Sequence, residues 1–374
     1  MRATEIRKPE RVLMTADTAG GVWTYAMELA AGLSDAGVSV SLATMGPAIS
    51  RSQLAEARAI RGLELYESGF RLEWQDDPWI NVTLAGEWLL RLEGYIKPDI
   101  VHLNNYCHGS LPWKAPSLIV AHSCVLSWWE AVRKGPISGE WNRYSQEVAA
   151  GLNGVHAVAA PSRAMLEALK RHYDFNAPSF VIPNGRTSSL FNPGKKEEIV
   201  FTAGRLWDEA KNIAALQAVS KKLSWPVCAA GPTEFASERF HTDGSIEMVG
   251  VLSASELSER LSRAAVFALP AKYEPFGLTV LEAALSGCAL VLGDIPSLRE
   301  LWEGAALFVS PDDRDGLIGT IERLAADRPL REKIGSMARE RGLAYSAERM
   351  VQGYLELYGR FMGSSIEEVQ ACAS

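Results

Sequence analysis

Short apolar segments recur along the chain, separated in most places by longer segments with helical periodicity. The first, residues 12–16, is followed by a glycine-containing loop and by an amphipathic helix to about residue 33. Further segments with a length typical of buried strands are residues 38–44, 100–103, 118–121, 155–159, 199–203, 226–230 and 264–269. Strands that alternate with helices predict parallel sheets, so we expect an α/β protein.

Helical patterns fill much of the sequence between these strands. We expect helices at residues 80–95 and 139–152, and another directly after Ser162, a good N-cap residue. Residues 317–362 are helical in pattern throughout. Residues 48–77 show no clear period, so a long irregular segment is expected there.

The length of the chain indicates more than one domain. A chain of 374 residues exceeds what one hydrophobic core usually holds. Prolines and glycines cluster between Pro183 and Gly194, which marks a linker. We therefore expect a first domain in residues 1–183 and a second in residues 184–346. Residues 347–374 should form a helix that crosses back to the first domain, followed by a frayed tail.

Charge and composition narrow the class of partner. A formal net charge of -7 argues against nucleic acid, which demands a basic face. Peripheral contact with a membrane surface stays open, because a local basic patch can coexist with that total. No segment approaches the roughly 20 apolar residues that span a bilayer, and the charged start of the chain is not a signal peptide. We expect a cytoplasmic protein, with the inner face of the membrane as an alternative location.

Cysteine usage and acidic residues give no sign of a metal site. Five cysteines are scattered without a CxxC pair, which favours free thiols over a disulfide framework or a zinc site. The acidic pair Asp76 and Asp77 lacks the spacing and neighbours of a metal site. The sequence predicts no bound metal and no other cofactor.

The most informative stretch follows the apolar segment at residues 264–269. It reads Glu274-Pro275-Phe276-Gly277-Leu278-Thr279-Val280-Leu281-Glu282. A strand that ends in a loop before a helix start is where parallel α/β sheets bind ligands. The amides of Gly277, Leu278 and Thr279 are expected to face an anion. Two carboxylates, Glu274 and Glu282, bracket these amides and suit the paired donors of a vicinal diol. The stretch therefore predicts one ligand that carries both phosphate and hydroxyl groups.

This stretch resembles the signature of retaining glycosyltransferases of the GT-B architecture, especially glycosyltransferase family 4. The resemblance implies that Glu274 binds hydroxyls of the donor sugar and that Glu282 takes the ribose diol. It also implies that the backbone from Phe276 to Leu278 holds the diphosphate. Two alternatives stay open, since Thr279 and Glu282 have the spacing of a capping box and a buried Glu274 could pair with an arginine.

A second element of the resemblance lies at the start of the second domain. Gly204-Arg205-Leu206 with Lys211-Asn212 is similar to a family element whose two cations clamp the diphosphate. An arginine fork together with the point charge of Lys211 suits two phosphates. Val249 lies where the backbone of the family receives the base.

The first half of the chain offers weaker matches. The glycine pair Gly20 and Gly21 follows the first strand, as in family 4, and either touches the donor or makes a tight turn. His122 resembles the histidine of the family that contacts the donor sugar near the reacting carbon. A structural role for His122 stays open, and His102 and His108 compete with it for the functional one.

Two cations further along the first half are candidates for acceptor binding. Arg133 and Lys134 either meet a charged acceptor or form an exposed solvated pair. The resemblance assigns this region to the acceptor side but identifies no acceptor.

The resemblance covers residues 17–358 and implies the GT-B fold, with two doubly wound Rossmann-like domains facing across a cleft. It implies metal-independent transfer, with retention, of a sugar from a nucleoside-diphosphate sugar. The acceptor would be a glycan, as in polysaccharide biosynthesis, a lipid-linked glycan or a small molecule. His122, Glu274, Arg205 and Lys211 would carry the reaction. The alternatives are a degenerate transferase that only binds a nucleotide sugar or glycan, and a related epimerase or phosphorylase. The donor base and the oligomeric state stay open.

Overall fold

The computed structural model describes residues 8–235 and 238–362, which form two compact units. The first unit comprises residues 8–127, 135–185 and 347–362, and the second comprises Trp128–Lys134 and Arg186–Ser346. Both units are Rossmann-like α/β layers built on a parallel sheet. The expected tail after Gly363 lies outside the described residues.

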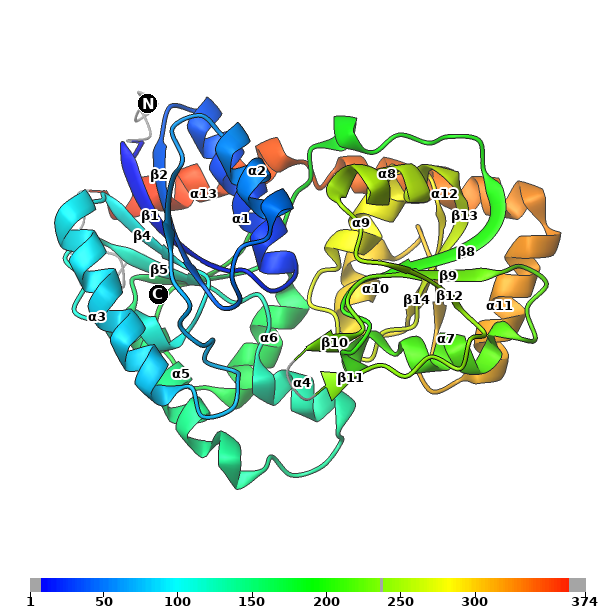
Figure 1. Ribbon diagram of the computed structural model, residues 1–374, viewed down its shortest axis with the longest axis horizontal. Helices are drawn as coiled ribbons and strands as arrows, with labels where there is room; N and C mark the ends of the chain where they lie inside the picture. The colour runs from blue at the N-terminus through cyan, green and yellow to red at the C-terminus, as the bar shows by residue number, and fades with distance from the viewer. Residues whose placement is uncertain (1–7, 236–237, 363–374) are drawn as a thin grey trace, which may run out of the picture. The chain divides into compact units, whose positions relative to one another are not determined.

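A seven-stranded parallel sheet forms the middle of the first unit, in the order β3-β2-β1-β4-β5-β6-β7 (Figure 1). Its strands are β1 (Arg11–Asp17), β2 (Ser39–Met45), β3 (Glu64–Glu67), β4 (Ile100–Leu103), β5 (Ser117–Val120), β6 (Ala157–Ala160) and β7 (Ser179–Val181). Strands β4, β5 and β6 are buried along their whole length, as expected for parallel strands covered on both faces.

Helices cover both faces of this sheet. Figure 1 shows α1 and α13 on one side and α3 and α5 on the other. The helices of this part of the chain are α1 (Gly21–Asp35), α2 (Arg51–Ala59), α3 (Trp79–Ile96), α4 (Val125–Val132), α5 (Asn142–Gly154), α6 (Arg163–His172) and α13 (Ala347–Phe361), with short 3-10 turns η1 (Cys107–Ser110) and η2 (Gly139–Trp141). Helix α13 approaches α1 closely, because a Cβ on Gly32 would lie 2.4 Å from a methyl group of Val351.

The second unit is built on a six-stranded parallel sheet in the order β12-β9-β8-β13-β14-β15. Its strands are β8 (Glu197–Ala203), β9 (Val227–Ala230), β12 (Glu247–Gly250), β13 (Ala264–Leu269), β14 (Ala289–Gly293) and β15 (Leu307–Val309). A short antiparallel pair, β10 (Glu234–Phe235) and β11 (Glu238–Arg239), lies outside this sheet. Every residue of β13 is buried, which explains why its sequence is uniformly apolar.

Helices also flank the second sheet on both sides. In Figure 1, α8, α9 and α12 lie on one side and α7 lies on the other. The helices of this unit are α7 (Ile213–Ser220), α8 (Ala254–Arg263), α9 (Leu278–Leu285), α10 (Pro296–Trp302), α11 (Arg314–Ala326) and α12 (Arg328–Leu343), with short 3-10 turns η3 (Ser188–Leu190) and η4 (Glu209–Lys211). One continuous apolar core joins the sheet to these helices.

Each sheet has one point at which the strand order reverses. In the first sheet, the chain builds outward from β1 to β3 and then returns to add β4 beside β1. In the second sheet, it builds outward from β8 to β12 and then returns to add β13 beside β8. Such reversal points leave a crevice at the carboxyl ends of the strands, where doubly wound proteins bind ligands.

The expectation of an irregular segment at residues 48–77 is wrong. Helix α2 and strand β3 lie within it. Ser50 and Gln53 close the start of α2 with a capping box, so local hydrogen bonds and not an apolar stripe begin the helix. Only one residue of α2, Ala57, is buried, which explains why its hydrophobic pattern is weak. Helix α4 is a further element that the sequence pattern did not predict.

Several cysteines of the chain are buried. Cys107, Cys228 and Cys288 are buried free thiols, and Cys372 lies outside the described residues. Across residues 8–235 and 238–362, no helix combines the length and apolarity needed to cross a bilayer.

Candidate active site

The loops after β8 and β13 meet at the reversal point of the second sheet. Lys211 in the first loop donates a hydrogen bond from Nζ to Oε2 of Glu274 in the second. Both side chains are largely buried, with 13% and 10% of their surfaces exposed. The amide of Lys272 donates to the carbonyl of Ala210 at 2.8 Å and ties the two loops together. The fold therefore brings two of the predicted site residues into direct contact.

Arg205 lies in the loop after β8, with Lys211, and one-third of its side chain is exposed. Its Nη2 donates to Oδ2 of Asp208 at 2.8 Å. Asp208 is buried and also accepts from the indole of Trp128 at 3.0 Å and from the amide of Ala210 at 3.0 Å. Burial raises the pKa of Asp208, but Arg205, Lys211 and these hydrogen bonds outweigh it and hold that pKa below its ordinary value. Sequence analysis missed Asp208, although an aspartate three residues after the arginine was a usable signal.

Helix α9 begins at the predicted place, with Gly277 as its N-cap in a left-handed conformation, φ 85°. A side chain there would be strained, and its Cβ would lie 2.9 Å from a methyl group of Val280. The structure rules out the capping box with Thr279, because no side chain caps this helix. The amides of the first turn, which include those of Leu278 and Thr279, have no acceptor within the helix by geometry. Uncapped amides at a helix start are the kind of donor that binds anions.

The side chain of Phe276 is part of the core and not of the site. It is 3% exposed, and its ring meets that of Tyr345 edge-on at 5.7 Å between centroids. Only the backbone of Phe276 is left to meet a ligand. The hydroxyl of Ser297 donates to the carbonyl of Glu274 at 2.6 Å and fixes the same loop from α10.

Glu282 lies one turn into α9 and is 3% exposed. Its Oε1 is 2.9 Å from Nε of Arg186, whose side chain is 7% exposed. The structure thus assigns the second glutamate of the signature an arginine partner that sequence analysis did not find. For Glu274, where an arginine partner was considered, the partner is Lys211.

Val249 lies in β12, a strand at the edge of the second sheet, and is half-buried. Backbone contacts connect the end of this strand to the loop that carries Arg205. The amide of Gly231 donates to the carbonyl of Gly250 at 2.8 Å, and a Cβ on Gly231 would lie 1.8 Å from the carbonyl of Gly204. The predicted base position and the predicted phosphate clamp are therefore joined through glycine backbones.

In the first unit, the glycine pair lies beside the reversal point. Gly20 is the N-cap of α1 with φ 98°, and Gly21 is the first residue of that helix. Both are exposed, and no side chain caps the helix. The first amides of this helix have no acceptor within the helix by geometry.

His122 follows β5 and lies next to the same reversal point. Its Nε2 is 2.8 Å from Oδ1 of Asn104, and its ring meets the ring of Tyr25 edge-on at 4.4 Å. Burial lowers the pKa of His122 to about 3, so the ring is neutral at pH 7. The amide nitrogen of Asn104 donates to the carbonyl of Thr15 at 2.6 Å, which leaves Oδ1 as the acceptor. Nε2 of His122 therefore carries the proton, and Nδ1 is the acceptor nitrogen.

The two competing histidines have structural partners. His102 is buried between the hydroxyls of Tyr25 at 3.1 Å and Tyr358 at 2.7 Å. His108 is buried between the side chain of Asn105 and the carbonyl of Val82. Of the three candidates, His122 is the one at a half-exposed strand end.

Arg133 and Lys134 are ion-paired within the second unit. Arg133 contacts Glu209 at 2.8 Å, and Lys134 contacts Asp312 at 2.6 Å. Arg133 and Lys134 are therefore partly exposed, as expected, but each forms an ion pair with a carboxylate. An acidic acceptor group would have to displace these carboxylates to reach either cation.

Comparisons with known families identify the chain. Residues 19–188 match the family model described as Glycosyltransferase Family 4, and residues 188–341 match the one described as Glycosyl transferases group 1. The chain belongs to the GT-B glycosyltransferases of the family 4 type. The loops of Arg205, Lys211 and Glu274 all fall within the second match.

Relatives of this family 4 glycosyltransferase are distant. A sulfoquinovosyl transferase of Arabidopsis thaliana is 33% identical over 159 residues, which are 40% of this chain and 31% of the plant protein. The alignments cover less than half of each of the first two curated relatives, 31% and 46%.

Solved structures resemble the family 4 chain over nearly its whole length. Sucrose-phosphate synthase from Thermosynechococcus elongatus has a TM-score of 0.79 at 20% identity, over 95% of this chain and 100% of that one. Anabaena Alr3699/HepE in complex with UDP-glucose has a TM-score of 0.73 at 14% identity, over 93% and 98%. At these identities the likeness establishes the fold.

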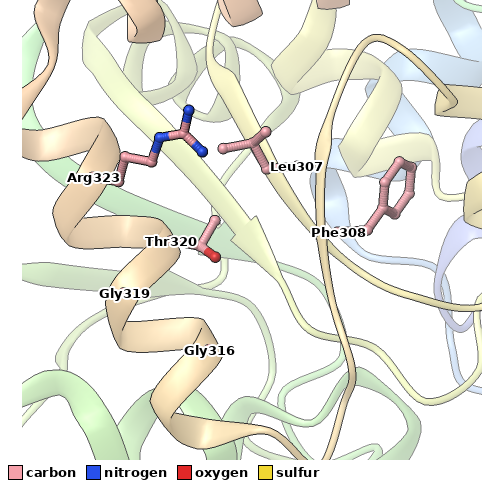
Figure 2. A pocket seen from close by; sticks show the side chains of 6 residues that line it. All are labelled: Leu307, Phe308, Gly316, Gly319, Thr320 and Arg323. Carbon is pink, nitrogen blue, oxygen red and sulfur yellow. The ribbon is translucent and has the colours of Figure 1, made fainter.

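A separate hollow of about 430 Å³ lies on the second unit of this glycosyltransferase, and none of the predicted site residues lines it (Figure 2). It is lined by Leu307, Phe308, Gly316, Gly319, Thr320 and Arg323. In Figure 2, Arg323 and Thr320 extend from α11 toward Leu307 of β15. Among the residues that the structure describes, no cluster of three or more His, Cys, Asp or Glu side chains is arranged to hold a metal ion.

Proposed function

We propose that the chain transfers a sugar, with retention of configuration, from a nucleoside-diphosphate sugar to a carbohydrate or glycolipid acceptor. The observation that carries this proposal is the contact of Lys211 with Glu274 at the reversal point of the second sheet. One loop supplies cations for a diphosphate, and the other supplies a carboxylate for hydroxyls. A ligand that needs both is a sugar diphosphate.

The cations and amides of the site suit the departure of a nucleoside diphosphate. Negative charge grows on the leaving phosphate as the bond to the sugar breaks. Arg205, Lys211 and the first-turn amides of α9 supply donors at one end of the sheet, so they stabilise this charge without reorganising. They should contribute more to the transition state than to substrate binding.

A metal ion is unnecessary in this proposal. Two protein cations and a helix start offset the charge of the diphosphate, which is the role that a divalent cation has in many phosphate sites. We therefore propose metal-independent turnover without any other cofactor.

Retention is proposed to follow a front-face route, in which the acceptor enters on the side of the departing phosphate. His122 is neutral and carries its proton on Nε2, so it acts as a hydrogen-bonding residue and not as a cation. Trapping of a glycosyl-enzyme adduct would contradict this route.

The Anabaena neighbour that binds UDP-glucose supports a nucleotide sugar as the donor class. The buried free thiols favour a reducing compartment, so we propose a cytoplasmic location, with peripheral membrane contact as an open alternative.

Calorimetric titration of UDP, GDP and ADP in the presence of a chelator tests the donor site. We expect one nucleotide to bind and Arg205→Ala to weaken it. Arg328→Ala is the matched control, because Arg328 forms an exposed ion pair with Glu332 within α12, outside the two loops. Binding that requires Mg²⁺ would contradict metal independence.

Turnover is tested with sugar nucleotides of the base that binds, and NMR gives the anomeric configuration of the product. Nucleotide binding without hydrolysis or transfer would favour a degenerate binding protein. Inversion of configuration would exclude the retaining mechanism. Absorbance near the visible edge would indicate a pyridoxal phosphate phosphorylase.

A further inference from the structure

Arg186 is a buried arginine that has no role in the reaction as proposed so far. It begins the longer of the two segments of the second unit. It is 6% exposed, and its Nε is 2.9 Å from Oε1 of Glu282. A buried charge needs a specific reason, because desolvation opposes it. We propose that Arg186 is a positioning residue that holds Glu282 for the ribose of the donor and so makes binding depend on the ribose hydroxyls. This inference rests on the proposed function.

The guanidinium of Arg186 is held in place from several sides. Its backbone amide donates to the carbonyl of Tyr345 at 3.1 Å, and a parallel bridge joins Arg186 to Ser346. The guanidinium carbon lies 5.0 Å from the ring centroid of Phe191, which is 1% exposed. An arginine stacked on a buried ring and anchored through its backbone is a cation with a fixed position. Glu282 therefore has a partner with one defined position.

The ion pair sets the charge state and the orientation of Glu282. A carboxylate buried without a cation tends to take up a proton, and a protonated carboxyl loses acceptor capacity. The positive charge of Arg186 favours the ionised form of Glu282. Arg186 approaches only one of the two oxygens, Oε1, with its Nε. A carboxylate has about four lone-pair positions on its two oxygens, so acceptor capacity for hydroxyls remains.

The pair also reduces repulsion within the site. An isolated carboxylate near a diphosphate would disfavour the ligand, since like charges in a poorly solvated site interact strongly. Arg186 and Glu282 together carry no net charge. Glu282 can then accept hydrogen bonds from the ribose hydroxyls with little electrostatic repulsion of the phosphates.

This arrangement predicts strong discrimination between ribo- and deoxyribonucleotides. A nucleotide that lacks one hydroxyl leaves buried acceptor capacity of Glu282 unmet, which costs roughly tenfold to hundredfold in affinity. Without Arg186, the carboxylate of Glu282 is neither oriented nor kept ionised. Most of the difference in affinity between ribo- and deoxyribonucleotides should then disappear.

The experiment compares dissociation constants for UDP, GDP and ADP with those for their 2′-deoxy and 3′-deoxy counterparts. For the base that binds, the wild-type ratio of deoxy to ribo constants should be roughly tenfold or more. Arg186→Met should lower the ratio to within about threefold of one, and Glu282→Gln should do the same. A merely structural role of Arg186 would change stability but leave the ratio unchanged.

Arg339→Met is the matched control. Arg339 donates to the carbonyls of Phe191 and Leu285, so it braces the same region from α12 without contacting Glu282. Its variant should lose stability and keep the wild-type ratio. A ratio that falls equally in Arg339→Met would overturn the inference.

If Arg186→Met does not fold, Arg186→Gln carries the test, because it retains a hydrogen-bond donor and removes only the charge. A wild-type ratio that persists in the variant, or a wild-type protein that does not discriminate, overturns the role of Arg186 while leaving the donor site intact. If none of the three ribonucleotides binds to wild type, both the proposed function and this inference are overturned.

Discussion

Lys211 donates a hydrogen bond to Glu274 across the reversal point of the second sheet. The two residues belong to loops that follow different strands, β8 and β13, and each loop was matched to the family separately. Without a ligand the two charges satisfy each other. A sugar diphosphate would replace this contact: its phosphate would accept from Lys211, and its hydroxyls would donate to Glu274.

Removing one partner of the Lys211–Glu274 pair should lower both stability and turnover, and removing both partners should restore stability alone. Lys211→Met leaves a buried carboxylate without its cation, so we expect a loss of about 3 kcal/mol in the free energy of unfolding. It should also lower kcat by about 10²–10³. The double variant Lys211→Met/Glu274→Gln should recover most of the stability and none of the activity. Urea unfolding and steady-state kinetics measure both, and a double variant no more stable than the single one would contradict the pairing.

Asp208 should stabilise the protein only when it is ionised. Its folded-state pKa lies below the ordinary 3.8, so its contribution is present above about pH 4 and is lost as the pH falls through the folded pKa. Asp208→Asn should cost about 1.5–3 kcal/mol at pH 7, typical of hydrogen bonds to a charged group. The unfolding free energies of wild type and variant should converge as the pH is lowered below 4, as followed by urea titration. A constant difference down to the lowest measurable pH would refute this assignment.

Gly231 should be required for the position of Arg205. A Cβ at Gly231 would lie 1.8 Å from the carbonyl of Gly204, and its φ is +134°. Gly231→Ala should therefore cost at least about 2 kcal/mol in stability and weaken nucleotide binding, because the loop before Arg205 must move. Gly319→Ala is the control, since nothing lies within 4 Å of its Cβ and alanine favours helix α11 by about 0.5–1 kcal/mol. Thermal melts and calorimetry compare the two variants.

His102 should make stability depend on pH from about 6.5 downward, a range that begins above that of the carboxylates. Burial, with a smaller contribution from neighbouring His122, lowers its pKa from 6.5 to about 3 despite an opposing hydrogen bond from Asn104. The folded protein therefore keeps His102 neutral, and the unfolded chain takes up the proton first. The stabilisation is full above pH 6.5 and falls as the pH drops toward 3, by up to about 1.4 kcal/mol per pH unit. Other buried histidines contribute in the same direction.

The variant His102→Gln separates the contribution of His102 to the pH dependence of stability from that of the other buried histidines. It retains hydrogen-bonding atoms for Tyr25 and Tyr358 but does not titrate. Its unfolding free energy, measured in urea between pH 7 and pH 4, should fall less steeply than that of wild type. Equal slopes would show that His102 does not carry this dependence.

The sequence predicted the parts of the fold that depend on local pattern. Strand β13 is uniformly apolar because both of its faces are buried, so its bounds were predicted correctly, and α9 begins where Gly277 allows a left-handed N-cap. Helix α2 was missed because it buries one residue only, and strand β3 because its four residues carry no apolar run. Periodicity reports burial, so exposed elements leave little trace in it.

The sequence also determined which residue types carry the candidate chemistry. The two glutamates, the arginine and lysine of the second domain and the glycine pair are all recognisable from local motifs. Their partners are not. Arg186, which pairs with Glu282, and Trp128, which donates to Asp208, are distant in the chain from the residues they contact. Only the tertiary structure could decide these partners, because a local motif contains the residues adjacent in sequence, whereas an ion pair forms between whichever side chains the packing of sheets and helices brings within about 4 Å.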